Sequence, residues 1–224
     1  WRAFELALKP SARRARRKRL NRMRRAGEVR FHVHDDPRRI AGLIDIALAW
    51  KRDWLANRGI ADGLPERAFF ARLLKSLPRR DRSGGTRWLM AELTFDGRPV
   101  ALDFGALRGD VFHAYLSAYD AALSAHSPGK VALWLMMQWC MERGLSSYDM
   151  LANPAPYKED WANARRPLLH LVHPVTLAGQ AYALWAARLR EVAQHCYEAL
   201  PEGLRGTLSA PLRRLRDGLA RGKH

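Results

Sequence analysis

The sequence lacks most of the features that mark secreted, membrane-spanning or disulfide-stabilised proteins. Its 224 residues contain two cysteines, Cys140 and Cys196, too few for a disulfide framework and typical of a reducing compartment. The longest run without a polar residue, 131–137, is far shorter than the roughly 20 residues that span a bilayer. No secretory signal is visible, and residue 1 is Trp, which indicates a chain cut from a longer one. These absences predict a soluble, cytoplasmic protein.

Acidic residues are scarce in two segments near the ends of the chain. Residues 11–25 hold nine Arg and Lys and no acid, and residues 205–224 hold six against Asp217. The net charge is +17, of which the rest of the chain carries only +3. Such segments attract polyanions, namely nucleic acid, anionic lipid or a phosphorylated substrate, although a solvated basic arm explains them equally well.

Hydrophobic periodicity and turn residues predict an alternation of helices and strands. Asp35 or Asp36 can cap a helix that has Pro37 in its first turn. Asp96-Gly97 is a strong signal for a hairpin between two strands. The expected helices cover 11–26, 36–58, 66–77, 128–143 and 177–199, and the expected strands cover 29–34, 87–95, 98–106, 111–119, 146–151 and 167–175.

The order of these elements defines the fold class. Three consecutive strands joined by tight turns form an antiparallel meander, and the apolar helix 128–143 then leads to a strand that can return parallel. A helix with apolar residues on nearly every side is expected to be buried against a sheet. The sequence therefore predicts an α+β fold with a mixed, mostly antiparallel sheet flanked by helices.

The segment Ser127-Pro128-Gly129 opens that buried helix directly after a strand. The first turn of a helix offers free N–H groups at its positive end, Gly129 lets a ligand approach the backbone, and Lys130 adds a cation. These features suit a phosphate or pyrophosphate. The alternative is an ordinary helix start capped by the Ser127 side chain.

Several short motifs occur in an order that resembles a known family. They are the S-x-x-R-x-x-R helix at 11–25, GRPVA at 97–101, Ala118-Tyr119-Asp120, Ser127-Pro128-Gly129, ERGL at 142–145, Tyr148-Asp149 and Tyr157-Lys158-x-x-Trp161. Together they resemble the GNAT-like acyltransferase domain of cellulose-biosynthesis-associated (CelD/BcsL-type) proteins, related to FemAB-type transferases. The resemblance covers residues 11–161. It departs at 150–154, where the family usually has a Gly-rich stretch.

The resemblance implies a GNAT (acyl-CoA N-acyltransferase) fold with acetyl-CoA, or another acyl-CoA, as co-substrate. In such folds strands 111–119 and 146–151 splay apart, and the pantetheine arm enters between them. Backbone N–H groups of Leu116 to Ala118 then orient the thioester carbonyl, while Ser127, Gly129 and Lys130 hold the pyrophosphate. The resemblance also implies three regions, which are a connector helix from a missing N-terminal half (1–28), the acyltransferase domain (29–176) and a C-terminal helix with a basic tail (177–224).

Direct acyl transfer needs a base for the nucleophile and an acid for the departing thiolate. Asp120 at the end of its strand is the first candidate base, with a capping carboxylate as the alternative, and His113 is the second. Tyr157 is the candidate acid, although a packed surface aromatic explains it as well. Lys158 is expected to hold an acidic substrate group or to orient its loop. Asp149, in an apolar strand, needs a partner such as Lys158 or an arginine if it is buried.

No cluster of residues has the spacing of a metal site, so no metal is expected. The predicted function is acyl transfer to an amine or hydroxyl of a small-molecule or saccharide acceptor, such as a polysaccharide precursor. Two alternatives remain, which are a FemAB-type transferase that uses aminoacyl-tRNA, suggested by the basic helix, and a non-catalytic GNAT-fold binding module. Nucleic acid is the less favoured partner because a pyrophosphate site points to CoA.

Overall fold

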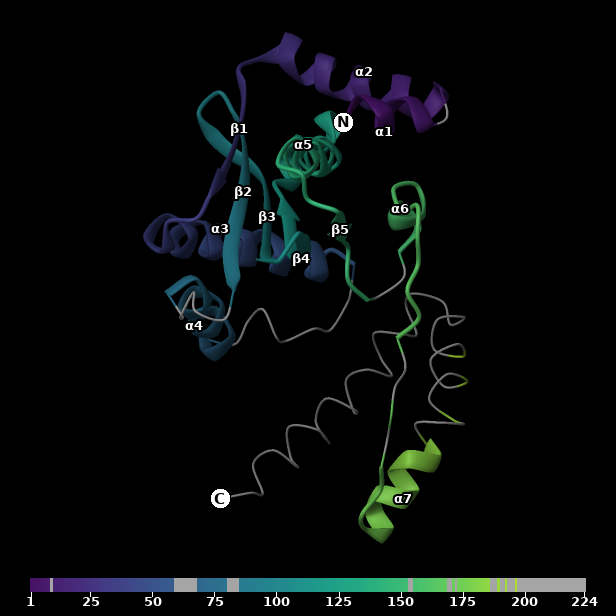
Figure 1. Ribbon diagram of the computed structural model, residues 1–224. Helices are drawn as coiled ribbons and strands as arrows, with labels where there is room; N and C mark the ends of the chain where they lie inside the picture. The colour runs from purple at the N-terminus through teal and green to yellow at the C-terminus, as the bar shows by residue number, and fades with distance from the viewer. Residues whose placement is uncertain are drawn as a thin grey trace. The chain divides into compact units, whose positions relative to one another are not determined.

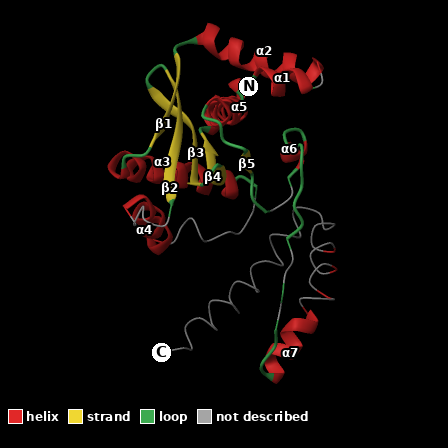
Figure 2. Cartoon of the chain, in the orientation of Figure 1, coloured by secondary structure: helices red, strands yellow, loops and turns green. Residues whose placement is uncertain are grey.

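The computed structural model describes residues 1–8, 10–58, 68–79, 85–152, 155–168, 171, 173–185, 189, 192 and 196. The chain divides into two compact units, Trp1–Lys158 and Glu159–His224. The first unit contains a five-stranded sheet with helices on both of its faces (Figure 1, Figure 2). The second contains the helix α7 (Leu177–Leu184) in its described part. No helix in the described ranges is long and apolar enough to cross a membrane.

The sheet follows the order of the sequence. Its strands are β1 (Val29–His34), β2 (Thr86–Phe95), β3 (Arg98–Arg108), β4 (Val111–Tyr119) and β5 (Ser147–Asp149). The strands lie in the order β1-β2-β3-β4-β5, with antiparallel pairing up to β4 and parallel pairing between β4 and β5. Asp96 and Gly97 close the β2–β3 hairpin with φ values of 48° and 76°. The predicted α+β fold with a mixed, mostly antiparallel sheet is confirmed.

Helices precede the sheet, cover it and connect its strands. They are α1 (Arg2–Ala7), α2 (Pro10–Ala26), α3 (Pro37–Ala56), α4 (Ala68–Ser76), α5 (Pro128–Glu142) and α6 (Pro156–Glu159), with short 3-10 helices η1 (Leu77–Arg79) and η3 (Ala121–His126). Asp36 caps α3 by accepting hydrogen bonds from the N–H groups of Arg38 and Arg39, at 3.4 and 3.0 Å. The expected cap at Asp35 or Asp36 is therefore Asp36.

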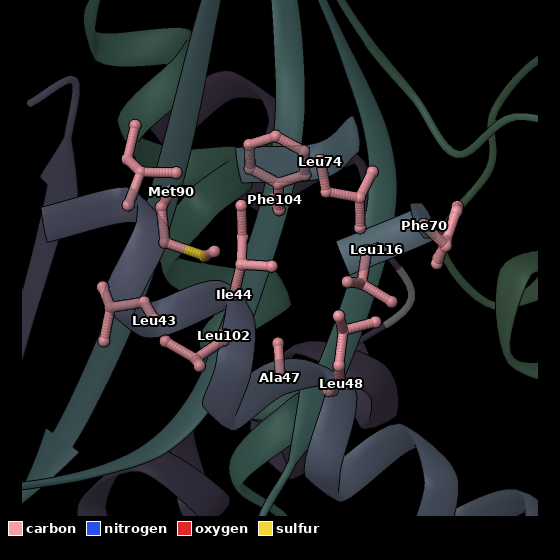
Figure 3. Close-up of a cluster of buried hydrophobic side chains, with 12 residues drawn as sticks. Leu43, Ile44, Ala47, Leu48, Phe70, Leu74, Met90, Leu102, Phe104 and Leu116 are labelled. Atoms are coloured by element: carbon pink, nitrogen blue, oxygen red, sulfur yellow. The ribbon is translucent and has the colours of Figure 1, made fainter. Parts of the chain in front are cut away.

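One face of the sheet is covered by α3 and α4. Their apolar side chains pack against alternate residues of β2, β3 and β4 (Figure 3). The buried cluster contains Ile40, Leu43, Ile44, Ala47, Leu48, Phe70, Leu74, Met90, Leu102, Phe104, Leu116 and Ala118. This cluster is the core on the α3 face of the sheet.

The opposite face of the sheet is covered by α5. Met136 and Cys140 pack there against Leu89, Ala91 and Phe112. Helix α2 lies on α5 in turn (Figure 1) and buries Leu20 and Met23. Because α5 lies between the sheet and α2, its sequence is apolar on nearly every side.

Three expectations about the elements are wrong. Ser127 makes no side-chain capping bond; it has left-handed backbone angles, φ 54° and ψ 50°, at the start of α5. The strand expected at 146–151 has only the three residues of β5. The described residues of 167–175 are irregular rather than strand.

Two expected helices extend beyond the described residues. The helix expected at 66–77 begins in the structure as α4 at Ala68, and residues 66 and 67 lie outside the described residues. Helix α7 ends at Leu184, and most of the expected helix after it also lies outside the described residues, as does the basic segment 205–224.

Candidate active site

The pairing between β4 and β5 stops soon after it starts. It consists of three residue pairs, and the last of them joins His113 to Asp149. β4 continues to Tyr119, and within the described residues no strand pairs with 114–119 on that side. We call the point where the pairing ends the fork. Beyond the fork, one edge of β4 offers backbone groups that a ligand can bind.

A β-bulge in β4 lies just past the fork. Phe104 of β3 is opposite Leu116, whereas Gly105 is opposite Ala114, so Tyr115 is an extra residue. As a result, Leu116 and Ala118 point into the core under α3, and Ser117 points to the α5 face. The backbone from Leu116 to Ala118, expected to orient a carbonyl group, therefore follows both the fork and the bulge.

His113 and Asp149 form a side-chain pair at the fork. Nδ1 of His113 lies 3.2 Å from Oδ2 of Asp149, and the two side chains are 35% and 45% exposed. Oδ1 of Asp149 accepts a hydrogen bond from the Leu151 N–H at 2.8 Å. A buried Asp149 was expected to pair with Lys158 or an arginine, whereas in the structure it is half-exposed and pairs with His113. The structure instead joins two residues that the sequence pointed to separately.

A buried carboxylate lies on the α5 face next to the fork. Oδ1 of Asp103 accepts a hydrogen bond from the Ser117 hydroxyl at 2.8 Å, and Oδ2 accepts one from the Tyr148 hydroxyl at 2.5 Å. These groups link β3, β4 and β5. Burial raises the pKa of Asp103 to about 6, although both hydrogen bonds oppose the rise. Burial and the neighbouring Asp103 raise the pKa of Tyr148 well above its usual value.

Helix α6 carries Tyr157 and Lys158. Nζ of Lys158 donates hydrogen bonds to the carbonyl oxygens of Met150, Leu151 and Ala152, at 2.7, 3.2 and 3.0 Å. An ammonium group has three donors, so Lys158 holds the loop after β5 in place. Burial lowers the pKa of Lys158, against the opposing effect of the Asp149 charge. Burial and the charge of Asp103 raise the pKa of the Tyr157 phenol.

Asp120 lies at the junction between β4 and η3. Its Oδ1 accepts a hydrogen bond from the Ala122 N–H at 2.9 Å, which makes it the cap of η3. The backbone N–H of Asp120 donates to the Val100 carbonyl oxygen at 2.9 Å. The capping role that the sequence left open is therefore present in the structure.

The start of α5 follows η3. The N–H groups of Lys130 and Val131 donate to the Ser127 carbonyl oxygen, at 3.0 and 3.2 Å. Gly129 donates no hydrogen bond to any described residue. A Cβ atom on Gly129 would lie 3.1 Å from Cδ1 of Tyr119, so the absence of a side chain lets this ring pack closely. Lys130 is exposed.

Asp103 is the site residue that the sequence analysis missed. A lone acid in the apolar strand sequence Ala101-Leu102-Asp103-Phe104 is a signal for a buried, partnered carboxylate. The same signal drew attention to Asp149, and applying it along β3 would have found Asp103. In the described part of the chain, no three His, Cys, Asp or Glu side chains gather as a metal site.

Comparisons with known proteins identify the family of this chain. The family model of the acetyltransferase (GNAT) domain matches residues 10–159. None of the curated proteins matches the sequence. A conserved protein of unknown function from Bacteroides thetaiotaomicron VPI-5482 is 20% identical, with a TM-score of 0.42, over 59% of this chain and 43% of its own. This chain thus spans less than half of that protein's length.

Two aminoglycoside acetyltransferases from uncultured soil metagenomic samples are also similar in structure. HMB0005 is 12% identical over 66% of this chain and 99% of its own, with a TM-score of 0.45. The enzyme meta-AAC0020, solved with sisomicin, is 10% identical over 66% of this chain and 97% of its own, with a TM-score of 0.42. Because the family model covers more than half of the sequence, the chain belongs to the GNAT acetyltransferase family.

Proposed function

We propose that this GNAT domain transfers an acetyl or other acyl group from acyl-CoA to an amine or hydroxyl of a sugar, polysaccharide precursor or related metabolite. The observation that carries the proposal is the fork, where β4 loses its partner strand immediately beyond the His113–Asp149 pair. An open strand edge beside an oriented imidazole is what direct acyl transfer needs.

The residues around the fork fit an acyl thioester with a phosphate-bearing end. Acyl-CoA supplies the activated acyl group. The open edge of β4 from Leu116 to Ala118 orients the carbonyl group through backbone N–H groups. The free N–H of Gly129, the cation of Lys130 and the positive end of α5 bind the pyrophosphate, together with the Ser127 hydroxyl, which makes no capping bond.

His113 is the base in this proposal. When the Nδ1–H of His113 donates a hydrogen bond to the Asp149 carboxylate, Nε2 keeps a lone pair that takes a proton from the acceptor. Asp149 thus orients the base and does not itself react. Asp120 is the second candidate, since its carboxylate already caps η3.

Tyr157 is the acid in this proposal. Its raised pKa keeps the phenol protonated, and a protonated phenol can give its proton to the departing thiolate. Lys158 supports this role by holding the loop between β5 and α6 through three carbonyl groups. In this proposal Lys158 acts on the loop and does not bind an acidic substrate group.

The test combines calorimetric titration with acetyl-CoA and an assay of thiol release with a panel of amino sugars, amines and sisomicin. For His113→Asn we expect about a 100-fold lower kcat with acetyl-CoA affinity within about twofold of wild type. His32→Asn is the matched control, because His32 is an exposed strand histidine in β1, and it should leave kcat unchanged. Tyr157→Phe should lower kcat by about tenfold.

Three results would contradict the proposal. A folded wild-type chain that does not bind acetyl-CoA would remove the donor, and binding of aminoacyl-tRNA in its place would favour the FemAB-type alternative. Full activity in His113→Asn would remove the base assignment. Donor binding without transfer to any acceptor in the panel would favour the non-catalytic binding module.

A further inference from the structure

Helix α2 carries most of the excess positive charge of the described residues. It contains Arg13, Arg14, Arg16, Arg17, Lys18, Arg19, Arg22, Arg24 and Arg25, and no acid. Arg17 forms an ion pair with Glu5, with Nη2 2.7 Å from Oε2. Among the described residues, no carboxylate pairs with the exposed Arg14, Lys18 or Arg22, so these three cations are available to an anionic ligand.

The placement of α2 is fixed by its buried side. Leu20 and Met23 are buried, and the guanidinium carbon of Arg16 lies 5.5 Å from the centre of the Trp134 ring on α5. Arg14, Lys18 and Arg22 are exposed and four residues apart, so they form one row along the helix. This row has a fixed direction relative to α5.

The row ends beside the start of α5. Nη2 of Arg22 donates a hydrogen bond to the Ala125 carbonyl oxygen in η3. Ala125 is two residues from Ser127 and five from Lys130, whose side chain is the exposed cation of the first turn of α5. A guanidinium has five donors, so Arg22 keeps donors for a ligand while bound to this carbonyl.

We infer that the Arg14–Lys18–Arg22 row binds the phosphate groups of the acyl donor, and that Arg22 is its main contact. This inference rests on the proposed acyl-CoA donor. The planar guanidinium fork matches phosphate oxygens in geometry as well as charge. The basic helix thus belongs to the donor site and adds cations to the one that Lys130 provides in the first turn of α5.

Arg24 provides a matched control for Arg22. It is an exposed arginine on the same helix, but two helical positions correspond to about 200°, so it points to the other side of α2. Replacing either residue with Gln removes one charge from the same helix. A difference in acetyl-CoA affinity between the two variants therefore reports the position of the arginine and not the net charge of the helix.

The experiment is calorimetric titration of wild type, Arg22→Gln and Arg24→Gln with acetyl-CoA, acetyl-3′-dephospho-CoA and S-acetylpantetheine. For Arg22→Gln we expect about tenfold weaker acetyl-CoA binding and a salt-dependence slope smaller by about one. Arg24→Gln should stay within about twofold of wild type. S-acetylpantetheine has no phosphate, so its affinity should be the same for all three proteins. A smaller Arg22 effect with the dephospho analogue would assign the contact to the 3′-phosphate, and an unchanged effect would assign it to the pyrophosphate.

The outcomes separate this inference from the proposed function. If wild type binds acetyl-CoA and the two variants weaken it equally, or not at all, the row is not a phosphate site and the inference is overturned while the donor stands. If wild type binds none of the three compounds, both the inference and the proposed donor are overturned. Unfolding curves of both variants that match wild type show that the comparison is between folded proteins.

Discussion

In the part of the chain that the structure describes, each face of the sheet buries one carboxylate, and the two carboxylates have different partners. On the α3 face, Glu92 meets two basic side chains, with Arg39 Nη2 at 2.6 Å and His34 Nε2 at 2.6 Å. On the α5 face, Asp103 accepts hydrogen bonds from the hydroxyl groups of Ser117 and Tyr148, and no basic side chain among the described residues pairs with it. Both residues are almost fully buried, at 2% and 4% exposure.

The difference shows what each face is built to do. Basic partners stabilise a buried carboxylate as an anion. Hydroxyl partners offset only a small part of the free energy that burying the charge costs. The pKa of Asp103 is accordingly raised to about 6. The α3 face thus pairs its carboxylate with an arginine and a histidine, whereas the α5 face beside the fork contains a carboxyl group, Asp103, whose pKa lies near neutral pH.

The largest effect is expected for Glu92→Gln. An amide leaves Arg39 and His34 without their anion, so we expect the free energy of unfolding at pH 7 to fall by roughly 4 kcal/mol. Urea denaturation measures this loss. The control is Arg87→Gln, which breaks an exposed ion pair with Asp35 at 3.1 Å and should cost less than about 1 kcal/mol. Equal losses in the two variants would contradict the distinction drawn for the α3 face.

The second effect is the pH dependence that Asp103 imposes. Its pKa is higher in the folded protein than the ordinary value of 3.8 for an aspartate, so the folded state binds the proton more tightly. Between pH 4 and 6 the unfolded state loses this proton first, and stability falls as pH rises, by roughly 3 kcal/mol in total. The cost is absent below pH 4 and fully present above pH 6.

Asp103→Asn tests this dependence directly. The amide is neutral at every pH and can still bond both hydroxyl groups, so the part of the pH dependence due to Asp103 should disappear. Urea denaturation of both proteins between pH 4 and 8 measures it. The variant should be more stable than wild type at pH 8 and similar at pH 4. A variant less stable at pH 8 would show that the charged form of Asp103 stabilises the fold.

A smaller effect is expected for Tyr148→Phe. The loss of one hydrogen bond to Asp103 should lower the free energy of unfolding by about 1.5 kcal/mol. Because that bond lowers the pKa of Asp103, its removal should raise the pKa further and move the pH transition upward. Ser117→Ala is the companion variant. It should lower the free energy of unfolding by about 1 kcal/mol and should also raise the pKa of Asp103. A downward move in either variant would contradict the assignment of the transition to Asp103.

The antiparallel part of the sheet was predictable because its signals are local. Asp96-Gly97 fixes the hairpin, Gly109 with φ 58° lies in the next turn, and Asp36 marks the start of α3. β5 was predicted too long because an apolar run gives no sign of where its partner strand diverges. The capping bond expected from Ser127 is absent because Ser127 has left-handed backbone angles, which the sequence alone does not reveal.

The sequence pointed to individual residues of the candidate site but not to the contacts between them. His113 and Asp149 were both named, but their contact depends on the register of parallel strands that are 36 residues apart in the chain. In the sequence, Arg22 is one of nine similar basic residues. The packing of α2 places it within hydrogen-bonding distance of the Ala125 carbonyl oxygen. Residues that meet through tertiary packing carry no spacing signal.

The extra residue Tyr115 changes which residues of β4 face each side of the sheet. Before it, Phe112 and Ala114 face α5; after it, Leu116 and Ala118 face α3 and Ser117 reaches Asp103. The bulge is what accommodates this residue: in an unbulged strand of the same sequence, Leu116 would share the α5 face with Phe112 and Ala114, and every later side chain would change sides. Ser117 would then enter the apolar layer under α3 and lose its contact with Asp103, so the bulge at Tyr115 decides that this strand supports a polar site.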